Sequence, residues 1–202
     1  GRHLEDILDI VGLKPGLEVA SSMSVMVLEK GSFFFCDPYV NPDPTASQLA
    51  EMAVMAAEQV RKFGLVPKLA LLSYSNFGSA QGESVLKVRK ALEMIKTIAP
   101  HLEVDGEMHA DAALNELIRN KTFPGATLKG MANLLIMPNL DAANIAFNMI
   151  KVLADGQPIG PLLLGPGKPI HILTPSVTTR GIFNMTALTM VDLLRLVGGT
   201  DV

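Results

Sequence analysis

The sequence has one cysteine, no tryptophan and few aromatic residues of any kind (5%), and its net charge at pH 7 is only −3. A single cysteine excludes an intrachain disulfide, which is typical of proteins of the reducing cytoplasm. The basic residues are scattered rather than clustered, which argues against nucleic acid as a partner. No apolar run approaches the roughly 18 residues that a transmembrane helix needs. We therefore expect a cytoplasmic globular protein with no nucleic-acid or membrane partner.

Apolar side chains, in contrast, are plentiful. They make up 49% of the 202 residues, and the mean hydropathy is +0.33, so the chain can enclose the packed core of one or two domains. Cys36 follows three consecutive phenylalanines, which predicts a buried, unreactive thiol. The chain begins with Gly1 rather than an initiator methionine, and we expect it to be a segment of a longer protein.

Helix-type and strand-type patterns alternate along most of the chain. Predicted helices cover residues 4–11, 46–63, 83–98, 110–120, 140–154 and 179–197, and predicted strands cover residues 19–28, 32–37, 69–73, 102–104, 133–137, 159–164 and 170–173. Thr45 and Gln48 have the spacing of a helix capping box, and Glu29-Lys30-Gly31 predicts a hairpin. The alternation predicts an α/β fold of three α/β/α layers, with a mostly parallel sheet and helices on both faces.

Ligands of such sheets bind beyond the carboxyl ends of the strands. The loop after the third predicted strand is the richest in small polar groups, with Ser75, Asn76, Gly78 and Ser79 directly before a helix. The same residue types are typical of a ligand-binding loop and of an ordinary turn, so both interpretations stay open at this point.

The densest cluster of acids and histidine covers residues 105–111. It could hold a metal ion. However, Glu107 and Asp111 also suit the start of the following helix, where the helix dipole favours carboxylates, and we favour that second interpretation.

Residues 165–168, Gly-Pro-Gly-Lys, partly resemble a phosphate-binding P-loop. They do not match the P-loop motif, because Pro169 stands where that motif requires Ser or Thr. Lys168 could still meet a phosphate or carboxylate as a point charge. His171 falls inside a predicted strand next to a polar turn, where both a structural and a ligand-contacting role are open.

Several motifs together resemble the phosphate acetyltransferase (phosphotransacetylase) family. These motifs are Asn41-Pro42-Asp43-Pro44-Thr45, the Ser75–Ser79 loop, Val104-Asp105-Gly106-Glu107, Met137-Pro138-Asn139-Leu140-Asp141-Ala142-Ala143-Asn144, Ile159-Gly160-Pro161 and Lys168-Pro169. The resemblance covers essentially the whole chain. It implies two α/β/α lobes with a CoA cleft between them, an architecture related to isocitrate and isopropylmalate dehydrogenases.

The same resemblance implies how the chain divides. Residues 1–13 would be the end of a first-lobe helix and a hinge, residues 14–158 the second lobe, and residues 159–202 a return segment that belongs to the first lobe. Most of the first lobe would then be missing from this chain.

The resemblance breaks at the catalytic positions. The family has Asn-Asp-Leu-Ser-Arg-Gly after the Lys-Pro pair and then an Asp, which acts as the base on the CoA thiol. The Ser, Arg and Asp positions are Thr174, Pro175 and about Gly181 here. A proline side chain cannot bind phosphate and a glycine cannot accept a proton, and loss of a general base alone costs roughly 10²–10⁴ in rate.

Around residues 173–188 the sequence instead resembles the phosphotransacetylase-like C-terminal domain of bacterial hybrid malic enzymes. That resemblance implies a longer protein whose preceding part decarboxylates malate with NADP and a divalent metal, while acetyl-CoA binds here as an allosteric inhibitor. It predicts a non-catalytic, acetyl-CoA-binding domain. The alternative is an active phosphate acetyltransferase, which makes acetyl phosphate and CoA from acetyl-CoA and phosphate.

The resemblance also implies an acetyl-CoA site with two walls and neither a catalytic nor a metal-binding residue. The predicted site residues are Ser75, Asn76, Phe77, Gly78, Ser79, Lys151, Ile159, Gly160, Pro161, Lys168, Thr174, Pro175 and Ser176. The last predicted helix has few polar positions, so we expect it to be buried nearly all round, with the subunit interface of a homodimer as one cover.

Overall fold

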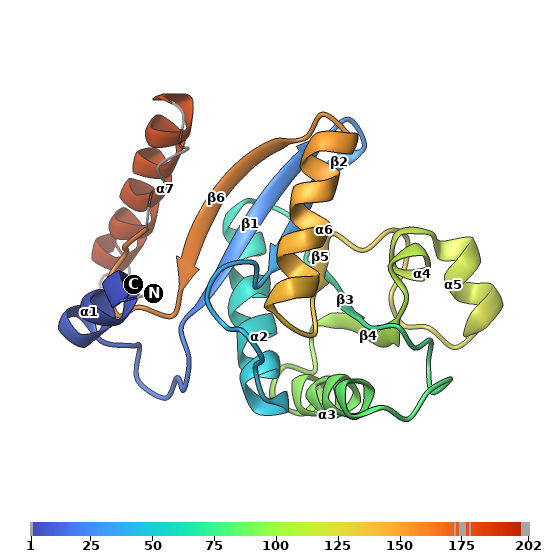
Figure 1. Ribbon diagram of the computed structural model, residues 1–202. Helices are drawn as coiled ribbons and strands as arrows, with labels where there is room; N and C mark the ends of the chain where they lie inside the picture. The colour runs from blue at the N-terminus through green and yellow to red at the C-terminus, as the bar shows by residue number, and fades with distance from the viewer. Residues whose placement is uncertain (1, 172, 174–176, 178, 199–202) are drawn as a thin grey trace.

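The computed structural model describes residues 2–171, 173, 177 and 179–198 and contains one six-stranded sheet (Figure 1). The strands are β1 (Ser21–Leu28), β2 (Gly31–Cys36), β3 (Lys68–Leu72), β4 (Glu103–Met108), β5 (Leu134–Ile136) and β6 (Gln157–Leu164), in the spatial order β4-β3-β5-β2-β1-β6. The β4–β3, β3–β5 and β5–β2 pairs are parallel, whereas β1 pairs antiparallel with both β2 and β6. The predicted α/β class with a mostly parallel sheet is confirmed.

Helices cover both faces of this sheet. The helices are α1 (Arg2–Val11), α2 (Ala46–Lys62), α3 (Glu83–Ile98), α4 (Ala110–Leu114), α5 (Glu116–Thr122), α6 (Leu140–Leu153) and α7 (Thr179–Gly198). α2 and α3 pack on the face that contains Phe34 and Cys36, and α4 and α6 pack on the opposite face, which contains Phe33 and Phe35. Successive side chains of β2 point to opposite faces, so this strand contributes to two apolar cores, one on each side of the sheet.

Local signals place the first elements as predicted. The hairpin runs from the Met23–Cys36 pair to the Leu28–Gly31 pair, and its turn is the predicted one. The Thr45 hydroxyl accepts the Gln48 N–H while the Gln48 side chain accepts the Thr45 N–H, so the capping box of α2 is present. These pairings depend on residues close in sequence, which is why the pattern alone identifies them.

Two predicted elements differ from the structure. The predicted helix over 110–120 is two helices, because Asn115 interrupts it and its side-chain oxygen accepts the N–H groups of Leu117 and Ile118 at the start of α5. The predicted strand over 170–173 is wrong for its described residues, none of which lies in a strand. There the His171 side chain, rather than a neighbouring backbone, accepts the N–H of Leu163 on the edge strand β6.

The described residues of this one chain bury only part of the last helix, so the expected burial nearly all round, with a subunit interface as one cover, stays a prediction. Met185 is buried and Leu188 packs against the α2 side of the core, but Phe183 is 74% exposed and Leu194 is 63% exposed. Figure 1 shows α7 beyond β6, at the outer side of the sheet. The apolar outer face of α7 is uncovered by the described residues.

The chain enters and leaves the sheet through two neighbouring segments. The Lys14 N–H donates to the Gly165 carbonyl and the Gly167 N–H donates to the Gly12 carbonyl, both at 2.9 Å. β6 pairs with β1 from Gln157 to Leu164, so the predicted boundary between residues 158 and 159 falls inside a strand of the sheet. The three-part division itself stays a prediction.

Among the helices that the structure describes, none combines the length and the apolar character that a transmembrane helix requires.

Candidate functional site

The carboxyl ends of β2, β3, β4 and β5 meet at one edge of the sheet, because these neighbouring strands are parallel. The segments that leave the sheet there begin at Asp37, Ser73, His109 and Met137. The polar loop after β3 and the acidic cluster of β4, which are about 30 residues apart in the chain, therefore come into direct contact.

The loop after β3 wraps around the carboxylate of Glu107. Glu107 Oε1 accepts the Ser75 hydroxyl at 2.7 Å and the Gly78 N–H at 2.8 Å, and the Glu107 carbonyl accepts the Phe77 N–H at 2.8 Å. Phe77 and Gly78 both have left-handed backbone angles (φ 44° and 96°), which turn their N–H groups toward Glu107. For Phe77 this conformation costs roughly 1–2 kcal/mol, and its ring stacks on Phe123 at 4.5 Å between centroids.

Arg89, from α3, completes this network. Its Nε donates to Glu107 Oε2 at 2.9 Å and its Nη2 donates to Glu107 Oε1 at 3.0 Å and to the Ala80 carbonyl at 2.6 Å. Burial of the Glu107 carboxyl opposes its ionisation, but the hydrogen bonds from Arg89, the Gly78 N–H and Ser75 together lower its pKa to about 2. Glu107 is therefore a buried anion with all its partners supplied by the protein.

This arrangement corrects our interpretation of Glu107. It is a strand residue, 1% exposed, and does not sit at the start of a helix, whereas Asp111 does lie in the first turn of α4. The strand pattern of β4 continues to Met108, which was a signal that Glu107 belongs to the sheet. Arg89 was missed because nothing local in the sequence connects it with a residue 18 positions away.

Asn76 links the loop to the next segment of the edge. Its side-chain oxygen accepts the His109 N–H at 2.8 Å, and His109 Nε2 lies 2.8 Å from the Tyr74 carbonyl. The Asn76 amide NH₂ group has no partner among the described residues, and the Tyr74 side chain is 64% exposed. These are the groups of the loop that a ligand could still engage.

Asp37, directly after β2, is a second buried carboxylate that the sequence analysis missed. It is 2% exposed and accepts the Ser22 hydroxyl, the N–H groups of Tyr39, Val40 and Asn41 at 3.0–3.1 Å, and the Asn41 amide at 2.6 Å. Its oxygens are occupied by this turn, so Asp37 shapes the edge of the sheet. Among the described residues no three His, Cys, Asp or Glu side chains lie together as metal ligands.

The structure does not bring the two predicted walls together within this chain. Ile159, Gly160 and Pro161 lie in β6, which three strands separate from β3. At the usual spacing of strands this is roughly 19 Å from the loop after β3. Lys151 is on α6, which covers one face of the sheet, while Lys168 follows β6 and lies near α2 on the other face. Thr174, Pro175 and Ser176 lie outside the described residues.

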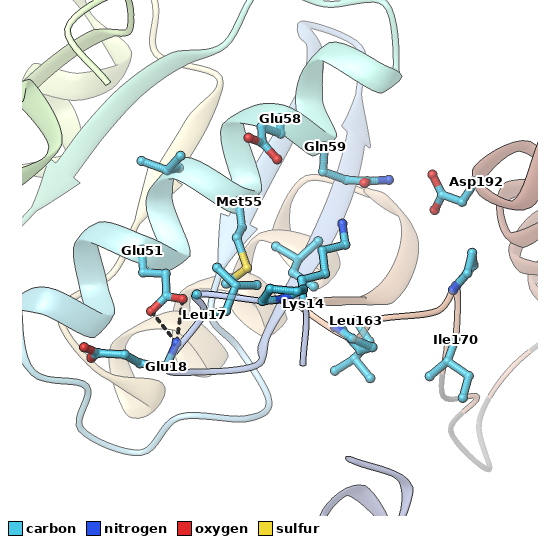
Figure 2. A pocket seen from close by; sticks show the side chains of 18 of the residues that line it. Lys14, Leu17, Glu18, Glu51, Met55, Glu58, Gln59, Leu163, Ile170 and Asp192 are labelled. Carbon is cyan, nitrogen blue, oxygen red and sulfur yellow. Dashed lines mark hydrogen bonds between the residues drawn. The ribbon is translucent and has the colours of Figure 1, made fainter. Parts of the chain in front are cut away.

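Lys168 lines a cavity of about 650 Å³ between α2, residues 14–18, residues 163–171 and Asp192 of α7 (Figure 2). The lining mixes apolar side chains such as Met55 and Leu17 with charges of both signs. Lys14 and Lys168 have no ion-pair partner among the described residues. Of the predicted site residues that the structure describes, only Lys168 contributes to this cavity.

His171 connects three elements at the end of this cavity. Its Nδ1 accepts the Leu163 N–H at 3.1 Å, and its Nε2 lies 3.8 Å from Asp192, which also pairs with Lys62 of α2 at 3.0 Å. Burial lowers the pKa of His171, and nearby Lys62 lowers it further, although Asp192 opposes this. The structure thus gives His171 a structural role as an acceptor for the edge strand.

A mostly parallel sheet between two helical layers, with a polar loop network at the carboxyl edge of its parallel strands, defines a three-layer α/β domain, a class in which ligands bind at that edge. Residues 1–190 match the family described as phosphate acetyl/butaryl transferase. The chain belongs to this family.

Solved structures and curated sequences of phosphotransacetylases are also similar to this chain. A phosphotransacetylase from Streptococcus pyogenes superposes with a TM-score of 0.91 at 33% identity, over 95% of this chain and 59% of its own. The phosphate acetyltransferase of Clostridium acetobutylicum is 37% identical over 96% of this chain and 61% of its own length.

Malic enzymes match at higher identity. The NADP-dependent malic enzyme of Salmonella typhimurium is 49% identical over 94% of this chain, and the NAD-dependent malic enzyme of Rhizobium meliloti is 48% identical over 95%. The chain spans a quarter of the length of each. The predicted identity as a phosphotransacetylase-like domain of the kind present in malic enzymes is confirmed.

Proposed function

We propose that this chain is the acetyl-CoA-binding regulatory domain of a cytoplasmic malic enzyme and does not itself transfer acetyl groups. The observation that carries the proposal is the difference in similarity: four malic enzymes are 44–49% identical to the chain, whereas four phosphate acetyltransferases are 35–37% identical. In the proposal, acetyl-CoA bound here inhibits the oxidative decarboxylation of malate to pyruvate in another part of the protein.

The residues at the family's catalytic positions support the non-catalytic role. Pro175 stands at the position of the arginine that the resemblance assigns to phosphate, and Gly181 at the position of the base. Neither side chain can hold phosphate or accept a proton. An acetyl-CoA site can survive these changes, because binding of the nucleotide and pantetheine parts does not need a base.

The described residues suggest which groups would meet the ligand. At the carboxyl edge, Asn76 and the exposed positions Gly78 and Ser79 border the open side of the loop, while Ser75 is fully buried. Lys168 is exposed and has no described partner, which suits a contact with a CoA phosphate. Since the two walls lie apart within this chain, we propose that the rest of the protein or a second copy completes the site.

Self-association is the companion proposal. The outer face of α7 exposes Phe183, Met190 and Leu194, which are 74%, 50% and 63% exposed. An apolar stripe of this kind favours burial against another surface. NADP and a divalent metal would belong to the catalytic part of the protein, and relatives named for NADP and for NAD are 49% and 48% identical to this chain.

Calorimetry on the intact protein tests the proposal, with acetyl-CoA and free CoA as ligands and malate turnover measured alongside. We expect acetyl-CoA to bind and to inhibit, and Lys168→Ala to weaken binding, while Lys121→Ala, an exposed lysine on α5, changes neither. Absence of binding at millimolar acetyl-CoA refutes the proposal. Formation of acetyl phosphate faster than about 1 s⁻¹ would favour the active acetyltransferase instead.

A further inference from the structure

We propose that Glu107 and Arg89 are positioning residues that hold the loop of residues 73–82 in the shape required for acetyl-CoA binding. This inference rests on the proposed function, because it takes the loop to be one wall of the acetyl-CoA site. It goes beyond the proposed function by assigning part of the affinity for the ligand to an ion pair whose carboxylate the ligand cannot touch.

Glu107 cannot contact a ligand itself. Its side chain is 2% exposed, and both carboxylate oxygens already accept hydrogen bonds from Arg89, Ser75 and Gly78. Each of these partners belongs to the loop or to the helix that follows it. Glu107 therefore acts on the outer surface only through the conformation that it gives to the loop.

The turn of the loop bonds to Glu107 through both the carboxylate and the backbone carbonyl of that residue. Three groups at its turn point to the same residue: the Ser75 hydroxyl, the Gly78 N–H and the Phe77 N–H. The Ser75 hydroxyl in turn accepts the Ala80 N–H at 3.1 Å, and Arg89 holds the Ala80 carbonyl at 2.6 Å. Without the carboxylate, the Ser75 hydroxyl and the Gly78 N–H, whose residue has a left-handed backbone, lose their acceptor, while the Phe77 N–H keeps its bond to the Glu107 carbonyl.

The ion pair reaches the ligand through Asn76 and Ser79. Both lie inside the segment that Glu107 and Arg89 restrain, and Ser79 Oγ accepts the Asn76 N–H at 2.9 Å. The Asn76 side chain also accepts the His109 N–H at the neighbouring strand end, so its amide group has a defined place only while the loop keeps the conformation seen in the structure. If only this conformation binds acetyl-CoA, the apparent affinity falls by the same factor as the fraction of molecules that adopt it.

The test compares Glu107→Gln with Glu103→Gln in the intact protein. Glu103 is a matched control, because it lies on the same strand and pairs with a basic side chain, Lys68, at 3.1 Å, but at the opposite end of β4. Calorimetry measures the Kd for acetyl-CoA, and hydrogen exchange measures protection of the Phe77, Gly78 and Ala80 amides with and without the ligand.

We expect Glu107→Gln to raise the Kd at least tenfold and to leave the Gly78 amide nearly unprotected until acetyl-CoA is added. Glu103→Gln should change the Kd less than twofold. Arg89→Met should resemble Glu107→Gln, and Arg89→Lys should restore part of the affinity, since it keeps the charge but not the two-point contact. If Glu107→Gln does not fold, the two Arg89 variants test the same inference.

Two results would overturn the inference. One is a loop that loses protection in Glu107→Gln or Arg89→Met while the Kd stays the same, since the loop shape would then not matter for binding. The other is retained protection of the Gly78 amide in both variants. If the unmodified protein does not bind acetyl-CoA, the proposed function fails together with the role in binding, and the exchange data alone then show whether the ion pair holds the loop.

Discussion

Acid should remove the stabilisation that the Glu107 network gives to the fold, and the structure sets the size of the effect. The pKa of Glu107 is about 2 in the folded protein against an ordinary value of 4.5. Because the folded pKa is lowered, the stabilisation is fully present well above pH 4.5 and is lost as the pH falls toward 2. A difference of this size corresponds to about 3 kcal/mol at pH 7 and about 1 kcal/mol at pH 3.

Glu107→Gln isolates this contribution, because glutamine has nearly the same size and cannot ionise. Urea unfolding followed by circular dichroism at pH 7 and pH 3 gives the free energy of unfolding of the protein and of the variant. We expect the variant to be about 3 kcal/mol less stable at pH 7, and the difference to shrink to less than half of that at pH 3. Glu103→Gln, which removes a partly exposed ion pair, should cost less than about 1 kcal/mol.

The reasoning would be refuted by a difference between the protein and Glu107→Gln that is the same at both pH values. Such a result would mean that the hydrogen bonds matter but the charge does not. A difference below about 1 kcal/mol at pH 7 would mean that burial of the carboxylate cancels the gain from its partners.

Three other predictions follow from the buried polar groups and the thiol. Burial, aided by Lys62, lowers the pKa of His171, so the hydrogen bond from the Leu163 N–H to the neutral imidazole should be complete above pH 6.5 and weaken as the pH falls below that value. Hydrogen exchange of the Leu163 amide, corrected for intrinsic rates, should show this loss of protection, and His171→Asn should abolish the pH dependence. Arg119 is fully buried and donates to four backbone carbonyls, so Arg119→Met should cost about 3–5 kcal/mol in urea unfolding, and a cost under 1 kcal/mol would contradict that role. Burial raises the pKa of Cys36, so thiol reagents should modify it only after unfolding, and rapid labelling of the native protein would disprove this.

The placement of most elements could be predicted from the sequence, because it depends on neighbouring residues. The predicted helix 83–98 matches α3 at both ends, and the α2 capping box is formed within four residues. Prediction was wrong where the outcome depends on distant residues. The segment 170–173 has the apolar composition of a strand, but the His171 side chain accepts the N–H of the edge strand instead of a paired backbone.

The candidate site divides in the same way. The polar composition of the loop after β3 marks it as a place for ligands or turns, but composition could not show that Ser75 and Gly78 are engaged with Glu107. The apolar character of the last helix predicted burial, whereas its exposed outer face depends on which surfaces lie near it. Neither property can be read from one segment alone.

The sequence by itself determined the order of most helices and strands and the family, because each of these is a property of residue identity and local spacing. Only the tertiary structure decided which strands lie side by side, and hence that Glu107 of β4 and Arg89 of α3 meet around the loop after β3. The physical reason is that hydrogen bonds and ion pairs act over about 3 Å, while the residues that make them are separated by tens of positions along the chain.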